Sequence, residues 1–221
     1  MTTGQTGADP AQVGLRRSLS RLYWNLHWDR FDVFVRPVST ADADFRAPAG
    51  YRFVFGSADL LSRCEAVHTE LDARDRERGA RRLELGHRLV LGLTEPGGLP
   101  VFSMWVNPRN LNVPGQQKRA LNPEQQFIYK AFTSPQHRGH KLYQAGMAFV
   151  LQDLFRRGQR ELVGYAHTDK HSSRAGLARL GFESVGHYRA VGYGRHQLIL
   201  NSPALLRRFP RRVPRSGLDL T

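Results

Sequence analysis

A basic turn that contains one glycine, SPQHRGHKLY from Ser134 to Tyr143, has the residue types best suited to binding chemistry. A helix that begins near Arg138 has unpaired backbone N–H groups in its first turn, and no Ser, Thr, Asp or Asn immediately precedes it as a cap. Gly139 lets a ligand approach the backbone closely, and the helix dipole favours negative charge. His140 and Lys141 add donors, and the turn has no acidic residue. The turn therefore predicts a site for a phosphate or pyrophosphate.

The segments on either side of the turn are expected to position it. The apolar run QFIYKAFT predicts a strand before it, and QAGMAFVLQDLF predicts a helix after it that reaches Arg157, with Gly158 as its stop. Further along, ELVGYAH predicts a strand, and TDKHSSRAGLARLGF predicts a helix that Gly181 ends. The segment SVGHYRAVGYGRHQLIL predicts a final pair of strands.

Earlier segments add strands and another helix. FDVFVRPV and YRFVF predict strands, and RLVLGLTEPGGLPVFSMWV predicts a hairpin that turns at Glu95-Pro-Gly-Gly98. After Ser57, an apolar stripe from Leu60 to Val67 and a charged end predict a helix that Gly79 finishes. The charged run from Asp72 to Arg82 is interpreted as a solvated face. Residues 107–124 are interpreted as a loop. Strands that alternate with helices in this way predict an α/β or α+β fold with a mixed sheet.

The composition bounds the possible functions. A chain of 221 residues is long enough for one sizeable core with an extension. Its one cysteine, Cys64, excludes an intrachain disulfide and a zinc site of several cysteines, and no metal is expected. The first residues, MTTGQTGADPAQ, are polar, and no apolar run approaches the roughly 20 residues that span a bilayer. We therefore expect a soluble cytoplasmic protein.

The chain is strongly basic. A formal net charge of +14 and a pI near 10.9 favour anionic partners, although arginines spread along the whole chain are explained equally well by ordinary surface solubility. Residues 11–28, AQVGLRRSLSRLYWNLHW, predict an amphipathic helix that either docks on its own domain or lies weakly on an anionic membrane surface. A nucleic-acid binder is not expected, because the sequence contains no recognisable binding module.

Two segments in register resemble a known family. The residues Gln136-His-Arg-Gly-His-Lys141 resemble the Q/R-x-x-G-x-G/A pyrophosphate loop of the GCN5-related N-acetyltransferases, and SSRAGLARLGFE resembles that family's helix ending in Leu-Gly-Phe. The resemblance covers residues 51–200 and includes the order of the elements. It implies a mixed, mostly antiparallel sheet flanked by helices, preceded by an N-terminal extension over residues 1–50 and followed by a basic tail over 201–221.

The resemblance also assigns residues to the donor, acetyl-CoA. Backbone groups of Phe132 and Thr133 pair with its pantetheine arm where the QFIYKAFT and ELVGYAH strands splay apart. Two departures from the family pattern are Lys141, in place of glycine or alanine, and Lys170, in place of a common asparagine. The residues assigned to hold the donor along the loop and the last helix are Gln136, His137, Arg138, Gly139, His140, Lys141, Leu142, Lys170 and Ser173.

The implied chemistry is direct attack of a neutral amine on the thioester, with an acid that reprotonates the departing thiolate. The family's usual acid is a tyrosine at the position of Leu177, so Tyr188 or Tyr193 is expected to substitute, with packing as the alternative role of each. His167, at the end of a strand, is the candidate base, because an unperturbed pKa near 6.5 suits proton transfer at neutral pH. A structural histidine is the alternative at that position.

Two features of the reaction stay open at this stage. The acceptor is an amine on a small molecule or a peptide. The donor is either acetyl-CoA or an acyl carrier protein, whose acidic surface would suit the positive charge of this chain. Both donors present phosphopantetheine, but only CoA brings the pyrophosphate for which Arg138 to Leu142 are arranged.

Overall fold

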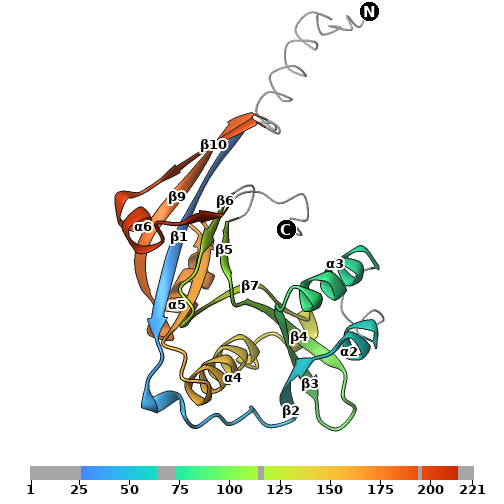
Figure 1. Cartoon of the computed structure of the whole chain (residues 1–221). Helices are drawn as coiled ribbons and strands as arrows, with labels where there is room; N and C mark the ends of the chain where they lie inside the picture. Colours follow the sequence, from blue (N-terminus) through green and yellow to red (C-terminus); the bar gives the residue numbers. More distant parts are fainter. Residues whose placement is uncertain (1–25, 64–72, 114–116, 194–195, 214–221) are drawn as a thin grey trace, which may run out of the picture.

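The computed structural model describes residues 26–63, 73–113, 117–193 and 196–213. Within these ranges an eight-stranded sheet has the order β10-β9-β1-β8-β7-β4-β3-β2, and a three-stranded sheet has the order β11-β6-β5 (Figure 1). Only the β7–β8 pair is parallel in the described ladders, so the predicted mixed, mostly antiparallel sheet is confirmed. The strands are β1 (Leu26–Pro37), β2 (Tyr51–Gly56), β3 (Arg88–Thr94), β4 (Pro100–Asn107), β5 (Asn110–Val113), β6 (Gln117–Ala120), β7 (Gln125–Thr133), β8 (Glu161–His167), β9 (Glu183–Tyr193), β10 (His196–Asn201) and β11 (Arg212–Val213).

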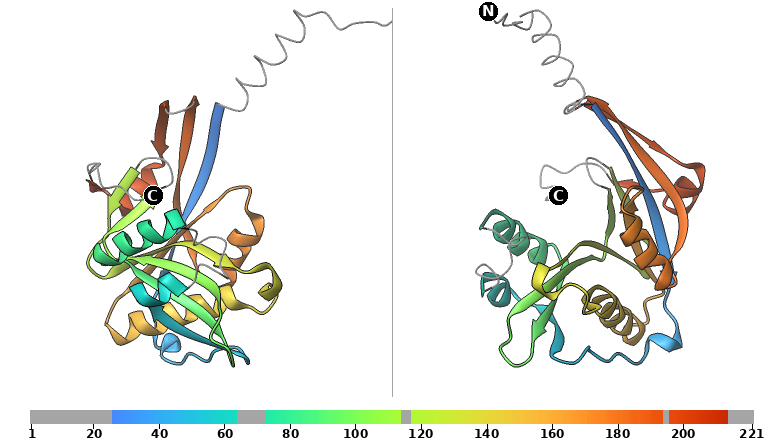
Figure 2. Two further views of the ribbon diagram at one scale, coloured as in Figure 1. Left: turned by 90° about the vertical axis from the view of Figure 1, so that its right-hand side faces the viewer. Right: turned by 180° about the vertical axis from the view of Figure 1, so that it is seen from behind.

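Helices flank the large sheet on both faces (Figure 2). Side chains of α4 and α5 share one buried cluster with Phe34, Phe102 and Ile128, whereas α6 shares another with Val33 and Tyr188. No helix in the described part of the chain is long and apolar enough to cross a membrane. The helices are α2 (Ala58–Arg63), α3 (Ala73–Glu84), α4 (Leu142–Arg156), α5 (His171–Arg179) and α6 (Pro203–Arg208), with 3₁₀ turns η1 (Thr40–Asp42) and η2 (Pro135–His137).

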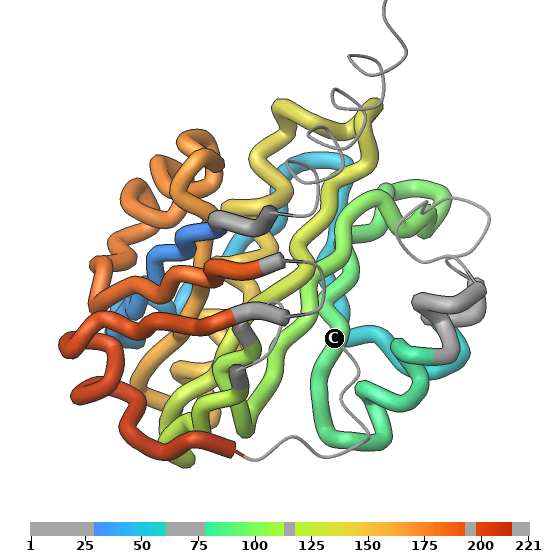
Figure 3. Tube along the Cα trace, turned by 90° about the horizontal axis from the view of Figure 1, so that it is seen from above, coloured from blue at the N-terminus to red at the C-terminus, as the bar shows by residue number. Residues whose placement is uncertain are grey.

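The strand β1 lies inside the sheet, between β8 and β9. Phe31 is opposite His167 of β8 on one side and opposite Tyr188 of β9 on the other. Seen from above, β1, β9 and β10 lie side by side (Figure 3). This part of the predicted N-terminal extension therefore contributes a central strand, because it satisfies the backbone groups of two strands that do not pair with each other.

Three local expectations are wrong in detail. The helix expected up to residue 28 does not reach Leu26, which begins β1, and the rest of that segment lies outside the described residues. The helix α3 continues past Gly79, which is buried, and Arg82 is 1% exposed instead of lying on a solvated face, since α3 packs on β3. Residues 107–124 are not a loop throughout, because β5 and β6 form a hairpin that β11 extends.

The start of the basic tail is part of the fold. Ser202 caps α6 by accepting a hydrogen bond from the backbone N–H of Leu205. Leu205 and Phe209 are 0% and 1% exposed, and the buried guanidinium of Arg119 donates to the Phe209 carbonyl at 2.7 Å. Residues up to Val213 therefore help to cover one face of the large sheet, and the remaining basic residue of the tail, Arg215, lies outside the described ranges.

Candidate active site

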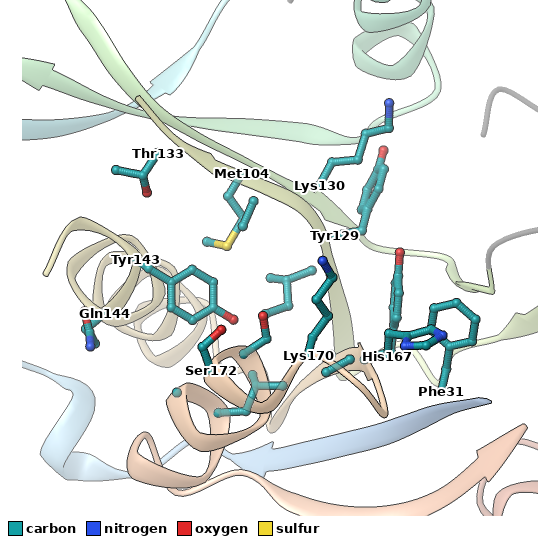
Figure 4. Close-up of a pocket in the computed structure, with 18 of the residues that line it drawn as sticks. Phe31, Met104, Tyr129, Lys130, Thr133, Tyr143, Gln144, His167, Lys170 and Ser172 are labelled. Carbon is teal, nitrogen blue, oxygen red and sulfur yellow. The ribbon is translucent and has the colours of Figure 1, made fainter. Parts of the chain in front are cut away.

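The strands β7 and β8 separate part-way along their length. Their parallel ladder consists of Gln125–Glu161, Gln126–Leu162 and Phe127–Val163. Beyond it, β7 stays paired with β4 up to Thr133, and β8 stays paired with β1 up to His167. The two strands therefore turn unpaired edges toward each other across a cavity of about 590 Å³, as the predicted splay requires (Figure 4).

A β-bulge shapes β7 at this cavity. The register between β4 and β7 shifts between Ser103 and Trp105, so that β7 has an extra residue there. Lys130 has φ 50°, a left-handed conformation that is uncommon for a residue other than glycine. A bulge bends its strand and turns a side chain away from the regular alternation. It lies where β7 and β8 separate, and this position accounts for the divergence of the two strands.

The glycine-containing turn forms a second, smaller cavity of about 230 Å³ at the start of α4. The helix begins at Leu142 and not near Arg138, because Gly139 and Lys141 have φ of 87° and 58° and interrupt the helical backbone. No side chain caps the helix, so its first N–H groups are available to a ligand. Five of the predicted loop residues line this cavity: His137, Arg138, Gly139, Lys141 and Leu142.

The other predicted donor residues occupy different positions. Gln136 and His140 do not line either cavity: Gln136 accepts a hydrogen bond from Ser134 at 3.0 Å, and the His140 ring lies 5.6 Å from the Tyr51 ring. Phe132 lines neither cavity, whereas Thr133 lines both. Lys170 and Ser173 line the larger one.

Comparison with known proteins identifies the fold of this chain. No family model and no curated protein matches the sequence. Among solved structures, a Drosophila protein aligns with 86% of this chain at a TM-score of 0.52 and 12% identity. A GCN5-related glucosamine N-acetyltransferase region of a fungal multi-domain GH3 β-N-acetylglucosaminidase aligns with 83% of it at a TM-score of 0.51 and 12% identity. The chain has the GCN5-related N-acetyltransferase fold.

The aligned region spans 60% of the Drosophila protein and 23% of the fungal protein. At 12% identity the likeness concerns the fold, and it confirms the fold expected from the loop and from the order of elements. The family resemblance places the usual catalytic acid, a tyrosine, at the position of Leu177. That side chain is buried, and it lines the cavity as part of its apolar wall.

His167 lies at the cavity, as its predicted role requires. Its Nδ1 accepts a hydrogen bond from the backbone N–H of Asp169 at 3.2 Å, and its Nε2 lies 3.2 Å from the carboxylate of Asp29. A neutral ring that accepts at Nδ1 carries its proton on Nε2, toward Asp29. Both ring nitrogens are thus engaged, so His167 can act as a base only after the Asp169 contact opens.

The predicted substitute acids do not have equal positions. Tyr188 is 0% exposed, stacks on Phe31 with ring centroids 4.9 Å apart, and does not line the cavity. Burial first, with a smaller contribution from Tyr165 and Asp29, raises the pKa of its phenol far above the ordinary value, and its hydroxyl has no hydrogen-bond partner among the described residues. This environment fits the packing role. The backbone of Tyr193 ends β9, and its side chain lies outside the described set.

A tyrosine that the sequence reading missed occupies the cavity instead. Tyr143, in the first turn of α4, lines both the splay cavity and the loop cavity. Burial raises the pKa of its phenol to about 12. Figure 4 shows its hydroxyl directed toward Ser172 of α5, with the Lys170 side chain also reaching into the cavity. The available sequence signal was a tyrosine directly after the loop, where a helix N-terminus meets the splay.

Proposed function

We propose that the protein is an N-acetyltransferase that moves an acetyl group from acetyl-CoA to an amine. The observation that carries this proposal is the continuity of the two cavities, since Thr133, Tyr143 and Gln144 line both. A donor with a pyrophosphate at one end and a thioester at the other fits a site that joins an uncapped helix N-terminus to a splayed strand pair.

The loop fits the pyrophosphate of CoA by its charge and its backbone. Arg138 and Lys141 are exposed beside the uncapped start of α4, and the residues that line the loop cavity include no acidic side chain. Arg138 donates a hydrogen bond to the Thr133 carbonyl at 3.4 Å, and this contact holds the guanidinium at the junction of the two cavities. Because the bond is long, a phosphate oxygen of the donor can replace it. An acyl carrier protein lacks the pyrophosphate, and this favours CoA as donor.

The chain's residues supply orientation and hydrogen bonding for the reaction. The donor contributes a thioester, which the amine attacks: a C–N bond forms, the C–S bond breaks, and the amine proton leaves to water or to His167. The unpaired edges of β7 and β8 offer backbone groups that can orient the donor. Tyr143 is protonated at neutral pH because its pKa is about 12. Since a thiol titrates near about 8.5, the phenol stabilises the departing sulfur by a hydrogen bond without complete proton transfer.

Binding and turnover test the proposal separately. Calorimetry with acetyl-CoA and with CoA measures whether the protein binds the donor, and release of the free thiol in the presence of an amine panel measures transfer. Acetylated carrier protein, presented in a parallel arm, tests the alternative donor. We expect acetyl-CoA to bind and to support transfer. If the protein does not bind CoA, and transfer occurs only from the carrier protein or from neither donor, acetyl-CoA is not the donor.

A further inference from the structure

The end of the splay cavity that lies away from the loop is lined by aromatic rings. Figure 4 shows Phe31, Tyr129 and His167 at this end of the cavity. Thr133 and Tyr143 lie at the other end, and both also line the loop cavity. Because the proposed function puts the donor at the loop end, the aromatic end is left for the acceptor.

The separation of β7 and β8 brings two tyrosines to this end. Tyr129 and Tyr165 lie two residues beyond Phe127 and Val163, the last pair of the parallel ladder, and alternate residues of a strand point to the same face. The Phe127 ring lies 5.7 Å from each tyrosine ring, at interplanar angles of 3° and 21°. The two tyrosine rings are therefore close to parallel, and both line the cavity.

Other contacts hold the rings of this end in place. The Tyr129 hydroxyl lies 2.6 Å from Nδ1 of His87, so it is already engaged, and Tyr129 offers a ligand its ring. The Phe31 ring stacks on Tyr188 at 4.9 Å, and it meets the Tyr165 ring at 5.7 Å and 71°. Side chains that are fixed before a ligand arrives lose little conformational freedom when it binds.

The composition of the cavity wall indicates the kind of body that it accepts. Its described lining contains no aspartate or glutamate, and a polycationic acceptor needs carboxylates to compensate the charges that it desolvates. Aromatic rings offer flat apolar surface, and offset-stacked or edge-to-face contacts with another ring stabilise beyond the burial of area. The wall therefore suits a planar apolar body better than a chain with many charges.

We propose that the acceptor is an amine with an aromatic ring, which binds against the rings of Tyr129 and Tyr165. This inference rests on the proposed function, because it names the substrate class of the same cavity. Phe31 borders this ring site from β1, and its ring lies 4.8 Å from that of His167, the candidate base. An amine on a ring bound here is therefore near the group that is proposed to take its proton.

Matched acceptors test the proposal through activity. The probes are 2-phenylethylamine, 2-cyclohexylethylamine and ethylamine, which share a primary amine and carry a planar ring, a puckered ring of similar size, or no ring. We expect kcat/KM for 2-phenylethylamine to exceed that for the cyclohexyl compound by about two- to tenfold, the effect of an aromatic contact. Burial of the ring should raise it roughly ten- to a hundredfold above ethylamine.

Two different results separate this inference from the proposed function. If an active enzyme turns over ethylamine or 2-cyclohexylethylamine as efficiently as 2-phenylethylamine, the aromatic acceptor is wrong and the acetyltransferase stands. Failure of acetyl-CoA to bind would instead overturn the proposed function.

Variants of the two tyrosines locate the ring site. Tyr165→Leu removes a ring, and we expect it to remove the preference for 2-phenylethylamine over 2-cyclohexylethylamine, with KM for acetyl-CoA unchanged. Tyr165→Phe and Tyr129→Phe keep their rings and should keep the preference. Phe155→Leu, at an exposed position of α4 that lines neither cavity, is the control for loss of a ring elsewhere. A preference that survives in Tyr165→Leu contradicts the site.

A binding measurement on the wild-type protein covers the cases in which variants misfold or no amine is acetylated. Fluorine NMR follows 4-fluorophenethylamine in the presence of the protein and CoA. Its signal should shift and broaden, because the rings of the site change its magnetic environment, and 2-phenylethylamine should reverse the change where the same concentration of ethylamine does not. An unchanged signal at millimolar protein and ligand, or equal reversal by ethylamine, excludes the ring site.

Discussion

The ring of Tyr143 in α4 packs against Gly176 of α5, where a methyl group added to the glycine would lie 3.7 Å from the ring. Gly176 immediately precedes Leu177, the position at which the family resemblance expects a tyrosine. A phenol from one helix therefore reaches the same part of the cavity that a tyrosine on the neighbouring helix would reach. The absence of a side chain at Gly176 leaves the room for it.

Tyr143→Phe is expected to lower kcat by about a hundredfold, the effect of removing one hydrogen-bond donor to a developing charge. KM for acetyl-CoA should change little, because the ring and its packing remain. Steady-state thiol release measures both constants. Tyr165→Phe is the matched control, since Tyr165 also lines the cavity and burial also raises the pKa of its phenol. Equal losses in both variants would contradict a particular role for Tyr143.

Gly139→Glu is expected to abolish binding of acetyl-CoA, because it puts a carboxylate beside the site proposed for the pyrophosphate. The φ of 87° means that any side chain adds strain of about 1–2 kcal/mol, although no atom lies within 4 Å of an added Cβ. Gly139→Ala has the same strain without the charge. Gly158→Glu adds the charge at another glycine with positive φ and open space, just after the C-terminal end of α4. Calorimetry that finds normal affinity in Gly139→Glu rules out the loop assignment.

The free energy of unfolding should fall as the pH falls from about 6.5 to about 4, because the pKa of His87 is lowered to about 4 in the folded protein. The unfolded chain then binds a proton that the folded chain excludes, so stability is complete above the unfolded pKa and is lost through this window. Urea unfolding at several pH values measures the slope. His87→Gln keeps a polar partner for Tyr129 and should have a shallower slope, and an unchanged slope would contradict this origin.

Phe209→Ala is expected to lower the free energy of unfolding by about 3–5 kcal/mol, since the side chain is 1% exposed in the cluster that α6 forms with β1 and β9. Denaturant unfolding measures the change. Removal of residues 214–221 is the control, and it should leave the midpoint within a few tenths of the wild-type value in molar denaturant. A loss in the truncated chain as large as that in Phe209→Ala would mean that the last residues carry the stability instead.

The sequence by itself determined the strand, the turn and the helix that surround the loop cavity. An apolar run, a turn with glycine and basic residues, and a second apolar run predicted β7, the loop and the start of α4, because these elements depend on residues within a few positions of one another. The left-handed φ of Gly139 is also a local property, because glycine adopts such a backbone conformation without a steric cost. Even there, the helix start predicted near Arg138 is too early, because the residue type at Lys141 does not indicate a left-handed conformation.

The tertiary structure alone decided which distant side chains meet. The insertion of β1 between β8 and β9 joins Phe31 to residues more than a hundred positions away, and any apolar strand of suitable length could satisfy those two edges. The burial of Arg82 and the contact between Tyr143 and Gly176 depend on how helices pack on the sheet. Such contacts depend on the shape of the assembled core, because packing selects among surfaces that local residue patterns describe equally well.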